Sequence, residues 1–406
     1  MRRGKDKGMN VMLTKIGADD TWVKRIGGIA LGLLVIFLLS IKGVAIYNGS
    51  LYLLLISLSI YSWKMGQLPK LPKRNIFSAY VFFCICVVLA GFLQGDMDSV
   101  KGGVGYVYRT LPFLLLYIGV SCFDKKDIVY KGILAALCVN ACTVLYWYLQ
   151  VWDRHSRLDI VDGPNLTIEI LSLSFIFGLL AVYKYRRNKL VLVTGVVSSL
   201  MLLLGMWWTA SRGGMMGLLV GAAVTFFYYL FAKKRERFKS PVVVSAFLMI
   251  VGALTVCSLT AYLFPRSSSD TERLCIYKSA VQMFTDHPVA GVGFYNFSKD
   301  YVNYVQPEEP SGIVFQHAHN DFLQFLSTTG VVGTIGFVFF SFVFLLELLR
   351  RVIYRPQEPI YLAMLCAFIT MYMHGLVDTA MCYNTGTRMV FGLLGMVFAI
   401  GDRREA

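Results

Sequence analysis

The chain contains 406 residues, of which 56% are hydrophobic and 16% are charged, and its mean hydropathy is +0.60. This composition leaves too little polar surface for a soluble protein of this length. The formal net charge of +15 would suggest a nucleic-acid partner in a soluble chain, so its distribution along the sequence has to be considered first.

Twelve apolar segments, each about as long as a bilayer crossing requires, follow one another along the chain. They cover residues 27–46, 50–63, 77–94, 103–122, 129–150, 167–184, 190–209, 212–232, 243–264, 320–349, 359–380 and 386–401. We predict an all-α polytopic membrane protein with about twelve transmembrane helices, the second and the last being the shortest. The prediction is a single membrane domain over residues 1–406, whose first helix is a retained anchor because no signal-cleavage pattern precedes it.

Basic residues are concentrated in every second connection. If the N-terminus is cytoplasmic, 28 of the 39 Lys and Arg residues lie on the cytoplasmic side. They occupy residues 2–25 and the segments 64–74, 125–131, 184–189, 233–239, 350–355 and 403–404. This bias predicts that both termini are cytoplasmic. The positive charge is therefore a topology signal, and we predict no nucleic-acid partner.

The nine cysteines lie mainly in apolar segments, without repeated CxxC spacing, and are predicted to be small core residues. A disulfide between Cys275 and Cys382 stays open, because the sequence does not supply the geometry that a disulfide needs.

Ionisable residues gather at the outward-facing ends of the predicted helices. They are Arg109, Glu169, Arg212, His319, Asp321, Asp378 and Arg388. A charge in or near hydrocarbon costs several kcal/mol unless it is paired or lines a wet cavity, so such residues mark functional sites. Snorkelling of a single side chain to the interface is the alternative, but seven residues on one side favour a site.

The longest outward connection covers residues 265–319. Within it, apolar residues recur at helical spacing between Thr271 and Phe284, which predicts a helix on the membrane surface. Pro288, Gly291 and Gly293 then predict a turn.

Ser211 and Arg212 open the eighth predicted helix. Ser211 can cap this helix, and Arg212 stands beside its unsatisfied backbone N–H groups, which together form a natural anion site. A guanidinium binds phosphate oxygens with two donors, so a diphosphate would suit this position. Gly213, Gly217 and Gly221 are predicted to let another helix approach closely.

His319 and Asn320 begin the tenth predicted helix at its outward end. A histidine at such a position can accept a proton near neutral pH, which makes His319 a candidate general base. His317 raises the alternative of a metal pair, but two histidines at i, i+2 with no placed carboxylate pair are a weak metal signal.

Two further groups of acids are ambiguous. Asp96 and Asp98 resemble a metal-binding DxD motif, although a solvated loop is the simpler interpretation. His374 and Asp378 are spaced i, i+4, which permits a hydrogen bond in either a packing or a functional pair.

At these residues the chain resembles the O-antigen ligase and polymerase superfamily of bacterial envelope glycan enzymes. The pattern of His-Asn, nine residues, Gly, two residues and Gly is met by His319, Asn320, Gly330 and Gly333. A helix-opening Ser-Arg is met at Ser211 and Arg212, and an Arg followed by P-x-x-G-x-G is met by Arg273, Pro288, Gly291 and Gly293.

The resemblance implies a glycosyltransferase of the membrane-embedded GT-C type in the bacterial inner membrane, with a short periplasmic helical loop at 265–319 between helices 9 and 10. The active site would face the periplasm. The expected donor is O-antigen linked to undecaprenyl diphosphate, the acceptor is the lipid A core oligosaccharide, and membrane lipids surround the protein. Neither a cofactor nor a metal is expected.

The resemblance also assigns roles to individual residues. His319 would be the base that activates the acceptor hydroxyl, and transfer would invert the anomeric centre. Arg212 and Arg273 would hold the donor diphosphate and stabilise the leaving group, with Arg109 as a further diphosphate-binding residue. His317, Asn320 and Asp378 would support the site.

Three alternatives remain. One is the polymerase of the same superfamily, which extends the glycan on its lipid carrier, and the second is a protein O-oligosaccharyltransferase. The compact loop and the complete His-Asn motif favour the ligase. The third is a transporter of lipid-linked glycan, but internal repeats and broken helices near the midplane, which are typical of transporters, are not evident here.

Overall fold

The computed structural model describes residues 21–66, 69–151, 157–160, 163–233, 267–308, 313–382 and 384–403. The described part is predominantly helical and contains no strand. Within it, eight helical segments are long and apolar enough to cross a membrane, and Pro359–Gly375 is a shorter apolar helix. The predicted all-α polytopic class is therefore confirmed, whereas the predicted helix at 243–264 lies outside the described residues.

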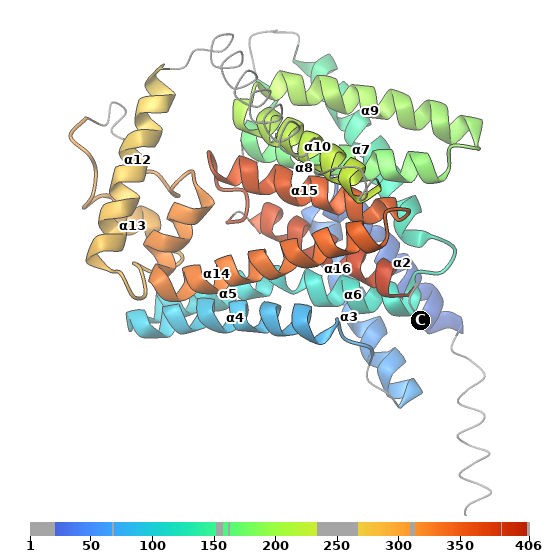
Figure 1. Ribbon diagram of the computed structural model, residues 1–406, viewed down its shortest axis with the longest axis horizontal. Helices are drawn as coiled ribbons and strands as arrows, with labels where there is room; N and C mark the ends of the chain where they lie inside the picture. Colours follow the sequence, from blue (N-terminus) through green and yellow to red (C-terminus); the bar gives the residue numbers. More distant parts are fainter. Residues whose placement is uncertain are drawn as a thin grey trace, which may run out of the picture.

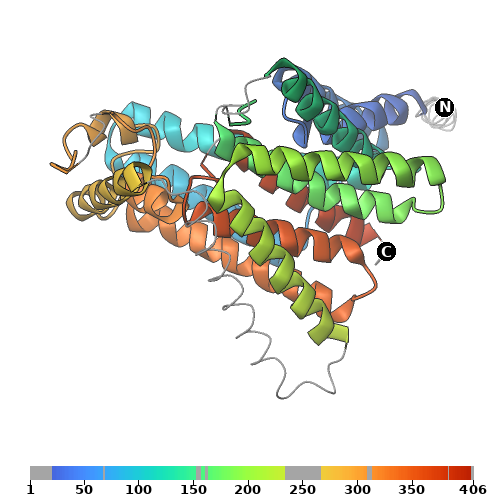
Figure 2. The same ribbon diagram turned by 90° about the horizontal axis from the view of Figure 1, so that it is seen from above.

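The long helices lie side by side in a bundle, with their axes roughly parallel or antiparallel (Figure 1). In chain order they are α2 (Thr21–Leu38), α3 (Val44–Met65), α4 (Arg74–Gln94), α5 (Met97–Thr110), α6 (Pro112–Phe123), α7 (Ile128–Gln150), α8 (Pro164–Lys184), α9 (Lys189–Thr209), α10 (Arg212–Lys233), α12 (Ser267–Asp286), α13 (Phe297–Tyr301), α14 (Asp321–Tyr354), α15 (Pro359–Gly375) and α16 (Asn384–Arg403). The helices α12 and α13 cover one end of the bundle, which we call the loop end (Figures 1 and 2).

Two of the predicted helix boundaries are wrong. The first and second helices meet at residues 39–43 rather than at 47–49, because Gly43 adopts a left-handed conformation with φ of 109°. Glycine accepts this conformation without steric cost. The predicted helix at 103–122 starts earlier, at Met97, and is divided at Pro112, whose missing N–H interrupts a helix.

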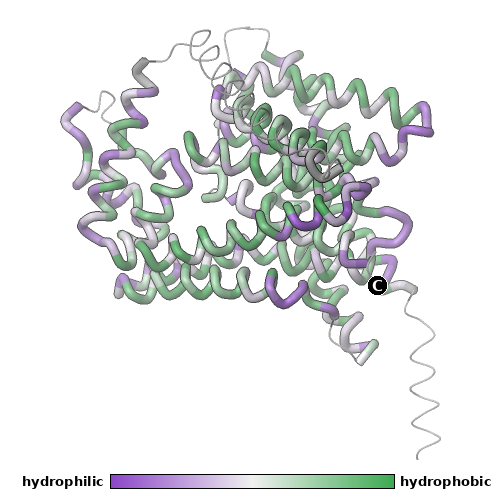
Figure 3. Tube along the Cα trace, in the orientation of Figure 1, coloured by the Kyte–Doolittle hydropathy of each residue, from purple (hydrophilic) through white to green (hydrophobic). Residues whose placement is uncertain are grey.

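The predicted grouping of basic residues is visible at the end of the bundle opposite the loop end. There Arg403 binds Asp124, Lys184 binds Asp127 with 2.6 Å between Nζ and Oδ1, and Arg351 binds Asp402 with 2.8 Å between Nη2 and Oδ1. Hydrophilic residues concentrate at the ends of the helices and apolar residues along their lengths (Figure 3). This distribution is what a bilayer requires of a helical bundle.

Small residues allow α10 and α15 to pack closely. A Cβ at Gly217 would lie 2.6 Å from the carbonyl oxygen of Thr370, and one at Gly221 would lie 2.8 Å from that of Cys366. The prediction that these glycines serve helix packing is confirmed. Their contact with α15 places the start of α10 beside His374, near the loop end.

Candidate functional site

The loop turn at Pro288–Gly293 interlocks with a break in α14. Gly330 has φ of 59° and ψ of −159° inside this helix, so the backbone groups on either side of it lack helical partners. The N–H groups of Val331 and Val332 donate to the carbonyls of Pro288 and Val289, at 2.8 and 3.2 Å. In return, the backbone carbonyls of Ser327 and Thr328 accept from the backbone N–H groups of the loop residues Val292 and Gly293, at 2.8 and 3.0 Å.

This exchange explains the glycines on both sides. A Cβ at Gly291 would lie 2.3 Å from the backbone of Thr328, and one at Gly330 would lie 2.4 Å from that of Val289. Real Cβ atoms do not approach so closely, and both residues also have positive φ. The two glycine patterns therefore form a single junction that fixes the loop, and α12 with it, against the start of α14.

The start of α14 positions His319. Asn320 is the N-cap, because its Oδ1 accepts from the backbone N–H of Leu323 at 3.0 Å, while its Nδ2 donates to the carbonyl of Leu376 at 2.8 Å. His319 has φ of 48°, an uncommon conformation for a residue other than glycine. Its carbonyl accepts from the hydroxyl of Tyr277 on α12, at 3.0 Å.

The side chain of His319 pairs with Asp378, which lies in the turn between α15 and α16. The distance from Nδ1 to Oδ1 is 3.0 Å. Asp378 is only 3% exposed, and each of its oxygens faces donors: Thr379 N–H donates to Oδ1 at 2.8 Å, Asn165 Nδ2 donates to Oδ2, and Arg273 Nη2 lies 3.9 Å from Oδ2.

These contacts determine the charge of Asp378. Burial alone would raise the pKa of its carboxyl, but the hydrogen bond from His319 and the nearby positive charges of His374 and Arg273 hold the pKa well below its usual range. An ionised Asp378 accepts the Nδ1–H of His319. Nε2 of a neutral His319 is then left as a proton acceptor, which is the tautomer that a general base needs.

Arg212 opens α10, as predicted, and its Nη2 lies 2.7 Å from Oδ1 of Asp270 on α12. The hydroxyl of Ser211 does not cap α10 as expected but donates to Oδ1 of Asn165, at 2.6 Å. Asn165 in turn donates to Asp378. A chain of hydrogen bonds therefore joins the start of α10 to the His319 pair.

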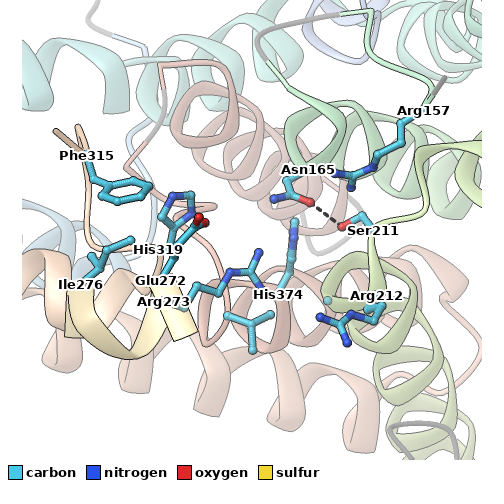
Figure 4. A pocket seen from close by; sticks show the side chains of 12 residues that line it. Arg157, Asn165, Ser211, Arg212, Glu272, Arg273, Ile276, Phe315, His319 and His374 are labelled. Carbon is cyan, nitrogen blue, oxygen red and sulfur yellow. Dashed lines mark hydrogen bonds between the residues drawn. The ribbon is translucent and has the colours of Figure 1, made fainter. Parts of the chain in front are cut away.

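These residues enclose a cavity of about 200 Å³ at the loop end. Figure 4 shows His319 on one side of it, Arg212 on the other, and Arg273 and His374 between them. Among the described residues, its lining comprises Arg157, Asn165, Ser211, Arg212, Gly213, Glu272, Arg273, Ile276, Phe315, His319, His374 and Val377. Three arginines and a helix start around a small polar cavity suit an anion with several oxygens.

His317 lies next to this cavity, with its ring centroid 4.3 Å from that of His319. The ligand atoms of His317, His319 and Asp378 lie within 4.8 Å of one another, a spacing that could hold a metal ion. A cation between His319 Nδ1 and Asp378 would displace their hydrogen bond. Burial and the neighbouring His319 lower the pKa of His317 to about 4.

Comparison with known proteins bears on this arrangement. Residues 197–338 match the model of a protein family described as O-antigen ligase. The match covers less than half of the chain and supports an O-antigen ligase-family assignment. Members of this family are membrane enzymes of the glycosyltransferase type, either ligases or polymerases, that act on lipid-linked glycans. A search of curated proteins found no match to the chain.

The segment that matches the O-antigen ligase family contains Arg212, Arg273 and His319. Four polar residues that complete the cavity or its hydrogen bonds lie outside it: Arg157, Asn165, His374 and Asp378. Sequence reasoning missed Arg157 and Asn165, which lie in or just after a polar connection where a single Arg or Asn gives no signal. Arg157 donates from Nε to the carbonyl of Thr209, at 2.8 Å.

Three other residues singled out in the sequence lie elsewhere. Arg109 is in the last turn of α5, deeper than expected, and does not line this cavity; it donates to the hydroxyl of Tyr295, and its guanidinium lies 5.1 Å from the centre of that ring. Arg388 lies over the ring of Tyr47. Asp96 caps α5 by accepting from the N–H of Ser99 at 2.8 Å, which gives this acid a structural role.

His374 and Asp378 do not use their i, i+4 spacing to pair with each other. His374 Nδ1 lies 3.0 Å from Oε1 of Glu169 on α8, whereas Asp378 pairs with His319. The cysteines Cys275 and Cys382 are both free thiols.

Proposed function

We propose that this protein is an O-antigen ligase, which transfers O-antigen from undecaprenyl diphosphate to the lipid A core oligosaccharide. The observation that carries the proposal is the His319–Asp378 pair in a cavity that also holds Arg212 and Arg273. A positioned base and a cluster of guanidinium groups are the two requirements for transferring a sugar from a diphosphate to a hydroxyl.

His319 is the general base in this proposal. A sugar hydroxyl is a poor nucleophile until its proton begins to leave, and His319 Nε2 accepts that proton. Asp378 holds the imidazole in the required tautomer through Nδ1 and stabilises the imidazolium that forms. The oxygen of the acceptor then bonds to the anomeric carbon of the donor from the face opposite the diphosphate, so the reaction inverts this centre.

Arg212 and Arg273 bind the diphosphate of the donor. The bond between the anomeric carbon and the diphosphate oxygen breaks as the new bond forms, and its electron pair leaves with the diphosphate. Two guanidinium groups fixed on α10 and α12 stabilise the charge that develops on the leaving oxygen. Asp270, which already occupies one edge of Arg212, would be replaced by a phosphate oxygen.

The proposed reaction uses no metal and takes place in the periplasm. The charge bias supports this orientation, because the loop end lies opposite the end that holds most of the basic connections. Reporter fusions within Thr271–Val305 should therefore report the periplasm, and fusions at residues 184–189 should report the cytoplasm. The reverse pattern would place the cavity in the wrong compartment for this reaction.

Deletion of the gene tests the choice between ligase and polymerase. Loss of a ligase leaves lipid-linked polymer of normal length and no polymer on lipopolysaccharide, whereas loss of a polymerase shortens the lipid-linked glycan itself. The second test is transfer by purified protein from lipid-linked donor to core acceptor in a chelating buffer. Retained turnover supports the metal-free base, and turnover that stops and returns with a divalent cation would contradict it.

A further inference from the structure

A second histidine and carboxylate pair is buried behind the cavity. The side chains of His374 on α15 and Glu169 on α8 are each 2% exposed, and Nδ1 and Oε1 are 3.0 Å apart. Ionisable groups at such a position cost several kcal/mol unless their charges are compensated. The catalytic scheme above uses neither of them, so their presence in an apolar helix interface needs an explanation.

The Nε2 edge of the His374 ring is directed into the cavity. His374 lines the cavity between Arg212 and Arg273 (Figure 4). A Cβ at Gly213 would lie 3.2 Å from Cδ2 and 3.7 Å from Nε2 of the imidazole, so the Nε2 edge faces the first turn of α10. The backbone N–H groups of a first helical turn have no partners within the helix and attract anions.

The surroundings of Glu169 determine what Nε2 can do. Its second oxygen, Oε2, is buried and has no hydrogen-bond partner among the described residues. A carboxylate with one acceptor contact and no further donor is poorly stabilised, so burial favours a pair with no net charge. The pair is neutral either as imidazolium with carboxylate or as imidazole with carboxylic acid.

Both neutral forms leave a proton on Nε2. In the ionic form both ring nitrogens are protonated. In the other form the carboxylic acid donates to Nδ1, and the proton of the neutral ring is then on Nε2. Either way, His374 presents a hydrogen-bond donor to the part of the cavity where Arg212, Arg273 and the start of α10 meet.

We propose that His374 is a third contact to the donor diphosphate, donating from Nε2 to a phosphate oxygen, and that Glu169 is the positioning residue that keeps this proton in place. The inference rests on the proposed function, because it assumes a diphosphate-linked donor. The proton of His374 stays on the ring throughout: the acceptor proton goes to His319, and the electron pair of the broken bond leaves with the diphosphate.

Binding of a short-chain polyprenyl diphosphate to the purified full-length protein tests this role separately from transfer. Because His374→Ala removes a hydrogen bond to a charged group, we expect this variant to lose about tenfold in affinity. His374→Gln, whose amide retains a donor, should lose less. Glu169→Ala should weaken binding as His374→Ala does, and Glu169→Gln, which can still donate to Nδ1, should restore part of it.

Two control variants separate this effect from general damage. His287→Ala removes an exposed histidine outside the cavity lining and should bind as wild type does. Thr370→Ser perturbs the same α10–α15 contact one turn away and should also retain affinity. If His374→Ala folds, binds and transfers as wild type does, the inference is wrong. If wild type itself does not bind the polyprenyl diphosphate, the proposed function fails instead.

A measurement on the wild-type protein covers the case in which the His374 variants do not fold. The ¹⁵N shifts of imidazole nitrogens distinguish protonated from unprotonated atoms, and the chain has only five histidines. We expect a protonated Nε2 on His374, whose signal moves when the polyprenyl diphosphate is added. An unprotonated Nε2, or a signal that does not respond to a diphosphate that binds, would overturn the proposal.

Discussion

Two histidines that line the cavity, His319 and His374, are each paired with a buried carboxylate, with the same contact and opposite surroundings. In both, Nδ1 lies 3.0 Å from a carboxylate oxygen. Asp378 receives donors on both oxygens, including Asn165 and the backbone of Thr379. Glu169 is contacted on one oxygen, and its other oxygen has no partner among the residues that the structure describes.

This difference determines which nitrogen each histidine offers to the cavity. A carboxylate surrounded by donors stays ionised and takes the Nδ1–H of His319, which leaves Nε2 as an acceptor. A carboxylate without such donors shares a proton with His374, which leaves Nε2 as a donor. The geometry of a pair is therefore insufficient to assign a base, and the donors around the carboxylate have to be counted.

The strongest test of the comparison is His319→Ala, because this change removes the proposed base. General-base catalysis is typically worth about 10²–10⁴-fold, so transfer by the purified variant should fall by that factor while binding of polyprenyl diphosphate is retained. His287→Ala is the matched control and should transfer at the wild-type rate. Wild-type turnover by His319→Ala would remove His319 from the reaction.

Asp378→Asn tests whether the carboxylate sets the tautomer of His319. The amide can donate to Nδ1 and so favours a proton on Nε2, which turns the base into a donor. We expect transfer to fall by about 10²-fold or more, mainly in kcat, because the base is disabled rather than the donor site. Asp127→Asn, at the opposite end of the bundle, is the control. An equal change in kcat and in donor affinity would indicate general disruption of the cavity.

Arg212→Lys and Arg273→Lys test the anion site that both pairs share. Lysine keeps the charge but loses the planar arrangement of donors. Each variant should lose more than tenfold in transfer, which corresponds to at least ~1.4 kcal/mol of transition-state stabilisation. Arg186→Lys is the control, because this exposed arginine lies over Tyr183 away from the cavity. Near-normal transfer in both cavity variants would give these residues a structural role only.

The general fold follows from local sequence patterns, but the junctions do not. Length and hydropathy predicted the membrane helices, because each helix satisfies its own backbone within one segment. The glycines at 291 and 330 were each recognised as part of a pattern. Nothing in either pattern indicates that the loop supplies the hydrogen bonds that α14 loses at Gly330, since that exchange joins residues about forty positions apart.

The candidate site could be predicted only in part, for the same reason. Arg212, Arg273 and His319 were found from motifs, and the structure places them around one cavity. The spacing of His374 and Asp378 permits a hydrogen bond between them, in either a packing or a functional pair. Local spacing could not reveal that α8 brings Glu169 to His374 and that the loop brings His319 to Asp378.

His317 gives the smallest expected effect on transfer, and it separates the neighbour of the base from the base itself. Burial and His319 lower the pKa of His317 from 6.5 to about 4 in the folded protein. As the pH falls from about 6.5 to about 4, the unfolded chain gains a proton at His317 that the folded chain does not, so the folded state loses stability over this range. In His317→Gln, the fall in apparent melting temperature between these pH values should be smaller than in wild type, while transfer at neutral pH should change far less than in His319→Ala. If the apparent melting temperatures of the two proteins fall equally between these pH values, His317 has the same proton affinity in the folded and unfolded chains.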